Sequence, residues 1–259
     1  MKKTLTWSFV LFAAAMVLMT VACGGGDDAE PAAESVASAP AAPAGSATIS
    51  GTVNAAGAED GDVAIKMDAD PVCAGLHEGV VESQTVVTDA DGNLANAFVY
   101  VKSGLTGSYS APAEAAILSQ QGCLYTPHVS GLMVGQTLKI VNNDPTLHNV
   151  HASPSENSEF NQAQPFQGME LEKTFDLVEV MIPVKCDVHP WMSSYMGVLE
   201  HPFFAVTGED GSFSIEGLPA GTYTIEVWHE SLGTQTAEAT VEADGSAQAD
   251  FSYGAGAGE

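Results

Sequence analysis

The sequence contains no arginine, and lysine is scarce. Its 259 residues include 7 Lys and Arg against 33 Asp and Glu, so the formal net charge at pH 7 is −26. Nucleic-acid binding depends on Lys and Arg that neutralise phosphates, so this composition excludes a nucleic-acid partner. The acidic residues are spread along the whole chain. This spread favours a solubility adaptation over electrostatic steering toward a basic partner.

Long hydrophobic runs are also lacking, apart from one near the N-terminus. This run extends from Leu5 to Ala22, follows two lysines and ends before Cys23. It is short for a transmembrane helix and has the flanks of an export signal. The stretch Val21-Ala-Cys-Gly24 resembles the signals of bacterial lipoproteins. That resemblance implies a signal peptide over residues 1–22 and a lipid on Cys23, whereas an ordinary signal peptide would leave Cys23 as a free thiol.

Residues 23–46 are rich in Gly, Ala, Pro, Ser and acidic side chains and show no hydrophobic periodicity. Such a composition predicts a flexible linker. Removal of the signal peptide takes Lys2 and Lys3 with it, which leaves five basic residues against 33 acidic ones and a net charge of −28. We therefore expect an exported protein, held by a lipid anchor on the periplasmic or outer face of a bacterial membrane.

No segment shows the periodicity of an amphipathic helix longer than about two turns. From Ala47 onward, short runs rich in Val, Ile, Thr, Phe and Tyr alternate with turn signals, and Asp-Gly dipeptides occur at 91–92, 210–211 and 244–245. Strands bounded by such turns are typical of β-sandwiches. The sequence therefore predicts an all-β fold.

The segment 207–227, which contains the turn Leu-Pro-Ala-Gly-Thr-Tyr, resembles the carboxypeptidase regulatory-like, or transthyretin-like, β-sandwich family. Members usually open with a segment like 87–101, which here lies far upstream. The resemblance therefore implies that a second domain is inserted into this sandwich, with two tandem units as the alternative. The expected boundaries are 47–111 and 202–253 for the transthyretin-like sandwich, 112–201 for the inserted domain and 254–259 for a tail.

One of the four cysteines opens a stretch with unusual ligand chemistry. The residues from Cys186 to Met192 read Cys-Asp-Val-His-Pro-Trp-Met, so a thiolate, an imidazole and a thioether occur within seven positions. Copper favours these ligand types. A short loop can direct all three inward if it joins two strands of a rigid frame. His148, which follows an Asn-Asn-Asp-Pro turn, is the candidate for a further ligand.

The segment Leu147–His151, taken with Cys186-x-x-His189-x-x-Met192, resembles the cupredoxin family, with the spacing of its amicyanin and plastocyanin-like members. The resemblance implies a Greek-key β-sandwich that binds one mononuclear type 1 (blue) copper. Its equatorial ligands would be His148, Cys186 and His189. Its axial ligand would be Met192, with Met196 as the alternative.

Neighbouring residues take supporting roles under the same resemblance. Asn149 would brace the two ligand-bearing segments against each other, and Pro190 with Trp191 would form an apolar rim around the histidine of the loop. His151 stands three positions after His148, and odd spacing on a strand puts two side chains on opposite faces. We therefore expect His151 outside the ligand set.

The remaining cysteines of the expected folded part are Cys73 and Cys123. In an exported protein, two such thiols predict a disulfide. The alternative is a second metal site that combines both cysteines with His77 and His128, although the spacing of these residues is loose for such a site.

These features predict a non-enzymatic electron carrier, which would pass single electrons between redox partners such as a cytochrome. Two alternatives stay open: a copper storage or delivery protein, and a surface scaffold that binds carbohydrate or protein and has a minor copper site. The seven histidines are mostly scattered and supply no obvious second catalytic copper centre. The loop has a single cysteine, which excludes the dinuclear copper centre of cytochrome oxidase.

Overall fold

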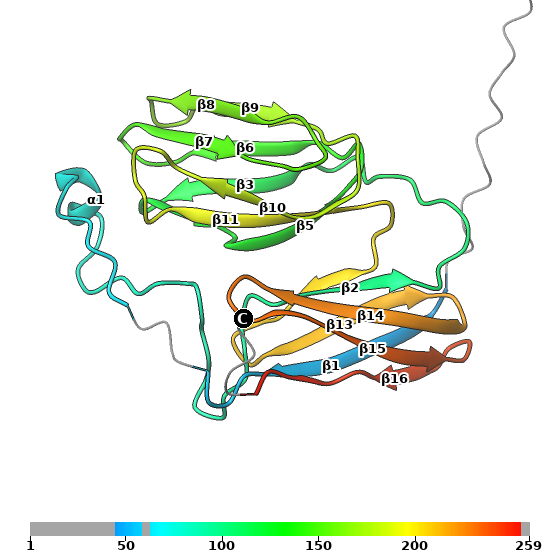
Figure 1. The fold of residues 1–259 in the computed structure, drawn as a ribbon. Coiled ribbons are helices and arrows are strands. Elements are labelled where there is room, and N and C mark those ends of the chain that lie inside the picture. The colour runs from blue at the N-terminus through cyan, green and yellow to red at the C-terminus, as the bar shows by residue number, and fades with distance from the viewer. Residues whose placement is uncertain (1–44, 59–62, 255–259) are drawn as a thin grey trace, which may run out of the picture. The chain divides into compact units, whose positions relative to one another are not determined.

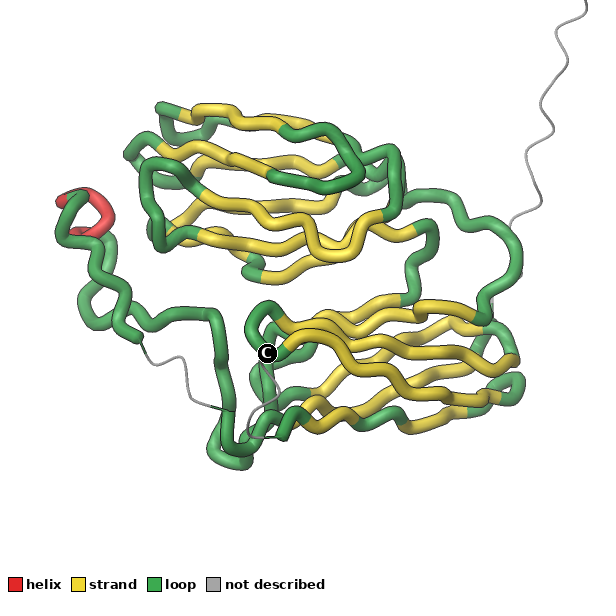
Figure 2. Tube along the Cα trace, in the orientation of Figure 1, coloured by secondary structure: helices red, strands yellow, loops and turns green. Residues whose placement is uncertain are grey.

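The computed structural model describes residues 45–58 and 63–254 (Figures 1 and 2). The predicted signal peptide, the predicted lipid at Cys23 and nearly all of the linker 23–46 lie outside the described residues, as does most of the tail 254–259. The described residues form strands and one short helix, so the predicted all-β class is confirmed. None of them belongs to a helix long and apolar enough to cross a membrane.

One β-sandwich combines strands from both ends of the described chain. Its first sheet has β1 between β13 and β16, with β17 also paired to β1, and its second sheet has the order β12-β2-β14-β15. Alternate side chains of β1 are buried, as expected for a strand with one face on a core. The inward side chains of both sheets share one hydrophobic cluster. The strand bounds are β1 Ala47–Asn54, β2 Phe98–Ser103, β12 Phe204–Val206, β13 Ser212–Leu218, β14 Gly221–His229, β15 Gly233–Val241, β16 Ser246–Gln248 and β17 Phe251–Ser252.

Two turns close this sandwich in the way that their sequences favour. Gly211, in the turn before β13, has φ of +69°, and its carbonyl accepts the N–H of Val53. A Cβ at that position would lie 2.6 Å from the carbonyl oxygen of Val53, so the turn requires glycine. In the turn between β13 and β14, which lie in different sheets, the Tyr223 hydroxyl donates to the carbonyl of Pro219 at 2.7 Å. The Leu-Pro-Ala-Gly-Thr-Tyr motif is therefore a short connection from one sheet to the other, held by a hydrogen bond from its own tyrosine.

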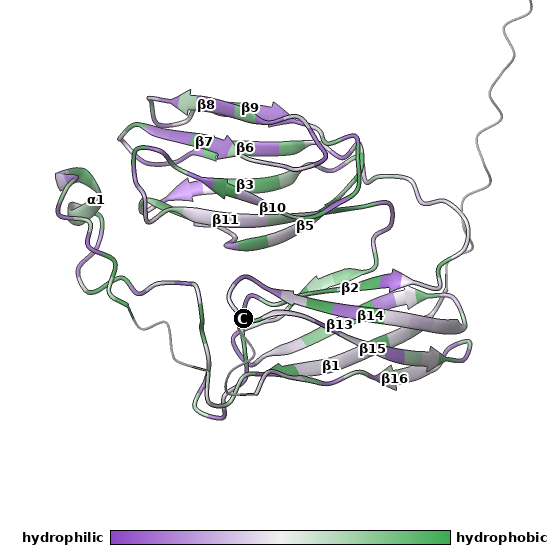
Figure 3. Ribbon diagram, in the orientation of Figure 1, coloured by the Kyte–Doolittle hydropathy of each residue, from purple (hydrophilic) through white to green (hydrophobic). Residues whose placement is uncertain are grey.

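A second β-sandwich is formed by consecutive strands from the middle of the chain, coloured green to yellow in Figure 1. One sheet has the order β4-β3-β6-β9 and the other β5-β11-β10-β7-β8. Their buried side chains form a separate hydrophobic cluster. The strands β8 and β9 carry mostly hydrophilic residues (Figure 3). The bounds are β3 Ala116–Gln121, β4 Leu124–Thr126, β5 Val129–Met133, β6 Leu138–Asn142, β7 His148–Ala152, β8 Phe160–Gln164, β9 Glu170–Lys173, β10 Glu179–Lys185 and β11 Ser193–Leu199.

The chain between β1 and β2 contains an excursion that packs on the second sandwich. Ile65 donates its backbone N–H to the carbonyl of Val81 at 2.8 Å, which pairs the outgoing and returning arms. Between the arms lies α1, Pro71–Gly75. Met67 and Cys73 are buried in the core cluster of the second sandwich. Part of the segment 47–111, expected in the first sandwich, therefore contributes apolar side chains to the second.

Candidate metal centre

Two neighbouring strands bring the predicted ligands to one end of the second sandwich. β7 begins at His148, and β10 ends one residue before Cys186. The two strands pair antiparallel, with Lys185 opposite His151. Because the start of one antiparallel strand lies beside the end of its neighbour, His148 and Cys186 meet at the same edge of the sheet.

Backbone hydrogen bonds hold the loop from Cys186 to Met192 in a compact form. The N–H of Cys186 donates to the carbonyl of Met192 at 3.2 Å, and the N–H of Met192 donates to the carbonyl of His189 at 2.9 Å. The N–H of His189 donates to the Cys186 sulfur at 3.4 Å. The loop is therefore closed on itself, with the thiol and the imidazole turned to the same side.

Three predicted equatorial ligands converge in this region. The Nδ1 atoms of His148 and His189 are 2.9 Å apart, and the Cys186 Sγ lies 3.8 Å from the Nδ1 of His189. One potential ligand atom from each of the three residues lies within 4.8 Å of the others. Their exposed fractions are 0%, 2% and 2% for His148, His189 and Cys186. A buried thiol and two imidazoles with converging donor atoms fit a soft or borderline metal ion.

The two methionines considered for the axial position are both buried. Met192 and Met196 belong to the same hydrophobic cluster as Cys186. Met192 ends the closed loop, whereas Met196 lies within β11, opposite Ile182 of β10. Met192 was predicted as the axial ligand because it belongs to the same loop as Cys186 and His189, and this assignment stays a prediction.

Hydrogen bonds shift the pKa values of Cys186 and His148 in opposite directions. Burial raises the pKa of Cys186, but hydrogen bonds from His148 and from backbone N–H groups outweigh it, so the pKa lies below its usual value. Burial lowers the pKa of His148, yet hydrogen bonds to Asp144 and Cys186 reverse the shift and raise this pKa to about 9. The sulfur is therefore prepared as a nucleophilic metal ligand.

Each imidazole has a carboxylate on the nitrogen that points away from the cluster. The Nε2 of His148 lies 2.9 Å from Asp144, whose carboxylate also accepts the backbone N–H groups of Gly122 and Cys123. The Nε2 of His189 lies 3.1 Å from Asp70. The hydrogen bond with His189 lowers the pKa of Asp70. A carboxylate on the distal nitrogen fixes the tautomer that leaves Nδ1 free for a metal.

These two carboxylates were missed by sequence reasoning. Asp144 stands four positions before His148, in a stretch interpreted only as a turn, so spacing could have indicated it. Asp70 carries no comparable sequence signal, because it is far from His189 in the sequence. It approaches His189 only because the excursion that contains α1 packs on the second sandwich.

Asn149 joins the two ligand-bearing segments, as its predicted role requires. Its side-chain oxygen accepts the backbone N–H of Asp187 at 2.6 Å, and its amide nitrogen donates to Asn161 at 2.6 Å. His151 lies outside the cluster, where it contacts Asp187 at 3.0 Å and Glu159 at 2.8 Å. The strand alternation that separated His151 from His148 is therefore present in the structure.

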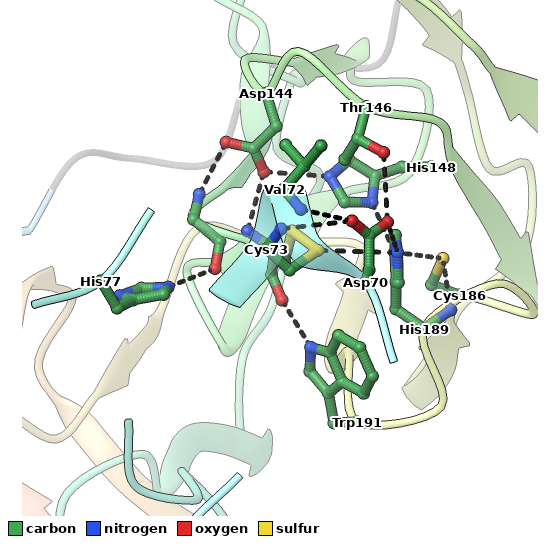
Figure 4. Close-up of a disulfide and its surroundings, with 12 residues drawn as sticks. Asp70, Val72, Cys73, His77, Asp144, Thr146, His148, Cys186, His189 and Trp191 are labelled. Atoms are coloured by element: carbon green, nitrogen blue, oxygen red, sulfur yellow. Dashed lines mark hydrogen bonds and ion pairs between the residues drawn. A yellow bond between two sulfur atoms is a disulfide. The ribbon is translucent and has the colours of Figure 1, made fainter. Parts of the chain in front are cut away.

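The surroundings of His189 differ from a simple apolar rim. Trp191 packs against the His189 ring with centroids 5.0 Å apart, and its Nε1 donates to the carbonyl of Cys123 at 3.0 Å. Pro190 is exposed. On the Nε2 side, however, Asp70 and Cys73 cover the ring (Figure 4). The Nε2 edge of His189 is therefore covered by residues from outside the loop, in addition to Trp191.

Cys73 and Cys123 form a disulfide, which ties α1 to the turn between β3 and β4. His77 and His128, the other members of the alternative metal site, have separate partners. The Nε2 of His77 lies 2.8 Å from the carbonyl of Gly122, and His128 contacts a backbone carbonyl and a carboxylate. Both thiols of that alternative site are thus consumed by the disulfide.

Comparisons with known proteins return one family match and several solved structures. A search of curated proteins returns no match to the chain. Among solved structures, the chain is similar to a purple cupredoxin from Nitrosopumilus maritimus, at 21% identity over 32% of this chain and 98% of that one, with a TM-score of 0.28. Amicyanin from Paracoccus versutus is 20% identical over 39% of this chain and 96% of that one, with a TM-score of 0.30.

A copper-containing nitrite reductase from Thermus scotoductus is 20% identical over 38% of this chain, with a TM-score of 0.32, and the match spans 25% of the reductase. The carboxypeptidase regulatory-like domain family matches residues 200–253, which include β12 to β17. The resemblance predicted from the tyrosine-containing turn is confirmed there. The chain therefore contains a carboxypeptidase regulatory-like segment, and the solved structures to which it is similar include cupredoxins.

Proposed function

We propose that the protein binds one copper ion in a mononuclear type 1 centre and passes single electrons between redox partners outside the cytoplasm. His148, Cys186 and His189 would be the equatorial ligands, and Met192 the axial ligand. The proposal depends above all on one observation. A thiol sulfur and two imidazole Nδ1 atoms converge in a buried cluster at the end of a β-sandwich.

The donor set suits both oxidation states of copper. Sulfur ligands favour Cu(I), whereas imidazoles also suit Cu(II), and bound copper would supply a one-electron couple. The side chains are carried by paired strands and by a loop with its own backbone hydrogen bonds. A donor set held in this way changes little between the two states, which favours fast electron exchange over ligand rearrangement.

The burial of the cluster favours an electron carrier over an enzyme. A catalytic metal keeps an open position that substrate can reach. Here the three equatorial candidates are at most 2% exposed, so a substrate would meet covering side chains first. The same burial disfavours storage or delivery, because those functions depend on ready exchange of the metal.

We also propose a cellular location and a class of partner. A lipid on Cys23 would hold the protein on the periplasmic or outer face of a membrane. The partner would be a redox protein such as a cytochrome. Although the spread of the acidic residues favours a solubility role for the charge, a net charge of −28 after signal removal would also suit a basic docking face better than an acidic one. Attraction to such a face would weaken as salt rises, because screening shortens the range of surface charges.

Replacement of His148 by alanine should weaken copper binding by more than about 100-fold, because changes to the contacts behind a ligand already cost 10- to 100-fold. Competition with a chelator of known affinity measures the change. His151→Ala is the matched control, since that histidine lies on the same strand and contacts Asp187 and Glu159 instead. Equal losses in the two variants would contradict the ligand assignment.

Copper affinity should rise with pH up to about pH 9. The pKa of His148 in the metal-free protein is about 9, so below that pH copper must displace a proton from this imidazole. We expect apparent affinity to increase about tenfold per pH unit between pH 7 and 9 and then to level off. Chelator competition across this range measures the slope. A flat profile would show that His148 is already neutral at pH 7.

A redox titration of the copper-loaded full-length protein tests the proposed function. We expect a reversible one-electron couple, with the copper content unchanged after repeated cycles of ascorbate and oxidant. Release of copper on reduction would overturn the carrier and support storage or delivery. A protein that takes up no copper but binds glycans or a surface protein would support the scaffold alternative.

A further inference from the structure

The distal edge of His189 is sealed by a segment that lies outside the second sandwich. Its Nε2 is 3.1 Å from the Asp70 Oδ2 and 3.6 Å from the Cys73 Sγ. His189 is only 2% exposed, although it lies in a loop between two exposed residues, Val188 and Pro190. The covering residues come from the excursion between β1 and β2, whose described residues contribute no strand to this sandwich.

Asp70 is held in one orientation by contacts on both of its oxygens. Its Oδ1 accepts the backbone N–H groups of Val72 at 2.7 Å and Cys73 at 3.3 Å, which caps the N-terminus of α1. Its Oδ2, which faces His189, also accepts the Thr146 hydroxyl at 3.3 Å. Thr146 lies in the turn that leads to His148, so the carboxylate bridges α1 to both histidine-bearing segments (Figure 4).

The disulfide fixes this arrangement from the other side. Cys73 belongs to α1, and its partner Cys123 donates its backbone N–H to Asp144, the carboxylate behind His148. Two constraints therefore hold α1 at the site. One is the disulfide, and the other is the pairing of the outgoing and returning arms of the excursion at Ile65 and Val81. We call residues 70–75 together with Cys123 the α1 cap.

We propose that Asp70 is a positioning residue for His189 and that the α1 cap retains the metal. The inference rests on the proposed copper function. Asp70 keeps the proton of His189 on Nε2, so that Nδ1 offers its lone pair inside the cluster. The cap also blocks the rotation that would carry the imidazole out to solvent. Loss of metal then requires the cap to open first.

The variant Asp70→Ser separates the two roles of this side chain. Serine is a good helix N-cap, so α1 keeps its first-turn hydrogen bonds, but its side chain is too short to reach His189. We expect copper release to a chelator to accelerate 10- to 100-fold, the range typical of lost contacts behind a ligand. The reduction potential should rise, because a less basic imidazole stabilises Cu(II) less.

The control is Asp68→Asn, which removes the same charge two residues away from an exposed position. It should leave both the release rate and the potential unchanged. Asp70→Asn keeps one oxygen for the helix cap and should fall between the wild type and Asp70→Ser. If the serine variant does not fold, the asparagine variant carries the test. Wild-type release rates and potentials in both Asp70 variants would overturn the inference.

Proton NMR of the metal-free protein gives a readout that needs no copper. A hydrogen-bonded, buried ring N–H of His189 should exchange slowly with solvent in the wild type and in Asp68→Asn. It should be lost in Asp70→Ser. A wild type that shows this proton but takes up no copper would refute the proposed function and leave the Asp70–His189 pair intact. Absence of the proton in the wild type would overturn the positioning role itself.

Discussion

Replacement of Cys186 by alanine should abolish the intense visible absorption of the copper-loaded protein. That colour arises from charge transfer between a thiolate and Cu(II), and Cys186 supplies the sulfur that converges with His148 and His189. We also expect copper affinity to fall by more than about 100-fold, since a ligand is lost and not only a contact behind one. Absorption spectroscopy during a Cu(II) titration measures both effects.

Two comparisons make this result specific to the thiolate. Cys186→Ser preserves the size of the side chain but replaces sulfur by oxygen, so it should lose the colour as completely as the alanine variant. His151→Ala leaves the cluster intact and should keep the wild-type spectrum. Colour that persists in the alanine variant would refute Cys186 as a ligand.

Removal of the Cys73–Cys123 bond should cost about 4 kcal/mol in the free energy of unfolding. The bond closes a loop of 50 residues, and the chain-entropy model assigns that much stabilisation to a loop of this size. We expect the double variant Cys73→Ala with Cys123→Ala to show this loss in equilibrium denaturation by urea. Both side chains are fully buried, so alanine is preferred to serine, which would bury an unpaired hydroxyl.

The single variants test whether the covalent link is responsible. Breaking the bond at either end removes the same constraint, so Cys73→Ala and Cys123→Ala should each cost nearly as much as the double variant. Two small losses that add up in the double variant would mean that side-chain packing, and not the link, stabilises the fold. The double variant should also release copper faster, because α1 would lose its covalent tie to the β3–β4 turn.

The ligand cluster could be predicted because its determinants are local in sequence. Cys186, His189 and Met192 lie within one loop, and the histidine of β7 enters beside it through ordinary antiparallel pairing. The alternation of strand side chains also separated His151 from His148 correctly. Short spacings and the period of a strand thus indicate which of these side chains lie together, whereas their roles as ligands come from the cupredoxin resemblance and stay a prediction.

The α1 cap could not be predicted, because it depends on a long-range path through the fold. Asp70 meets His189 only because the excursion between β1 and β2 buries Met67 and Cys73 in the second core. That excursion has a five-residue helix and little regular pairing, so neither helical nor strand periodicity indicates where it packs. Because no periodicity marks this packing, the sequence predicts that the whole segment 47–111 belongs to the transthyretin-like sandwich.

The structure around Pro183 could be predicted only in part. A proline within the strand predicts either an edge position or a bulge. In the structure, β10 lies between β11 and β7, so it is not an edge strand. Its register with β11 shifts between Glu179 and Ile182, and Met181 has φ of +66°. The sequence could indicate an irregularity, whereas the sheet order excludes an edge strand and the register shift places the irregularity just before Pro183.

The central claim is that His148, Cys186 and His189 bind a single copper ion through a thiolate and two imidazoles. Combined visible and EPR spectroscopy of the full-length protein, loaded with Cu(II) and then reduced with ascorbate, tests it most directly. We expect one copper per chain, an intense thiolate-to-copper band, a narrow copper hyperfine splitting and reversible bleaching on reduction. A weakly coloured protein with the EPR spectrum of copper bound only by nitrogen and oxygen would contradict it.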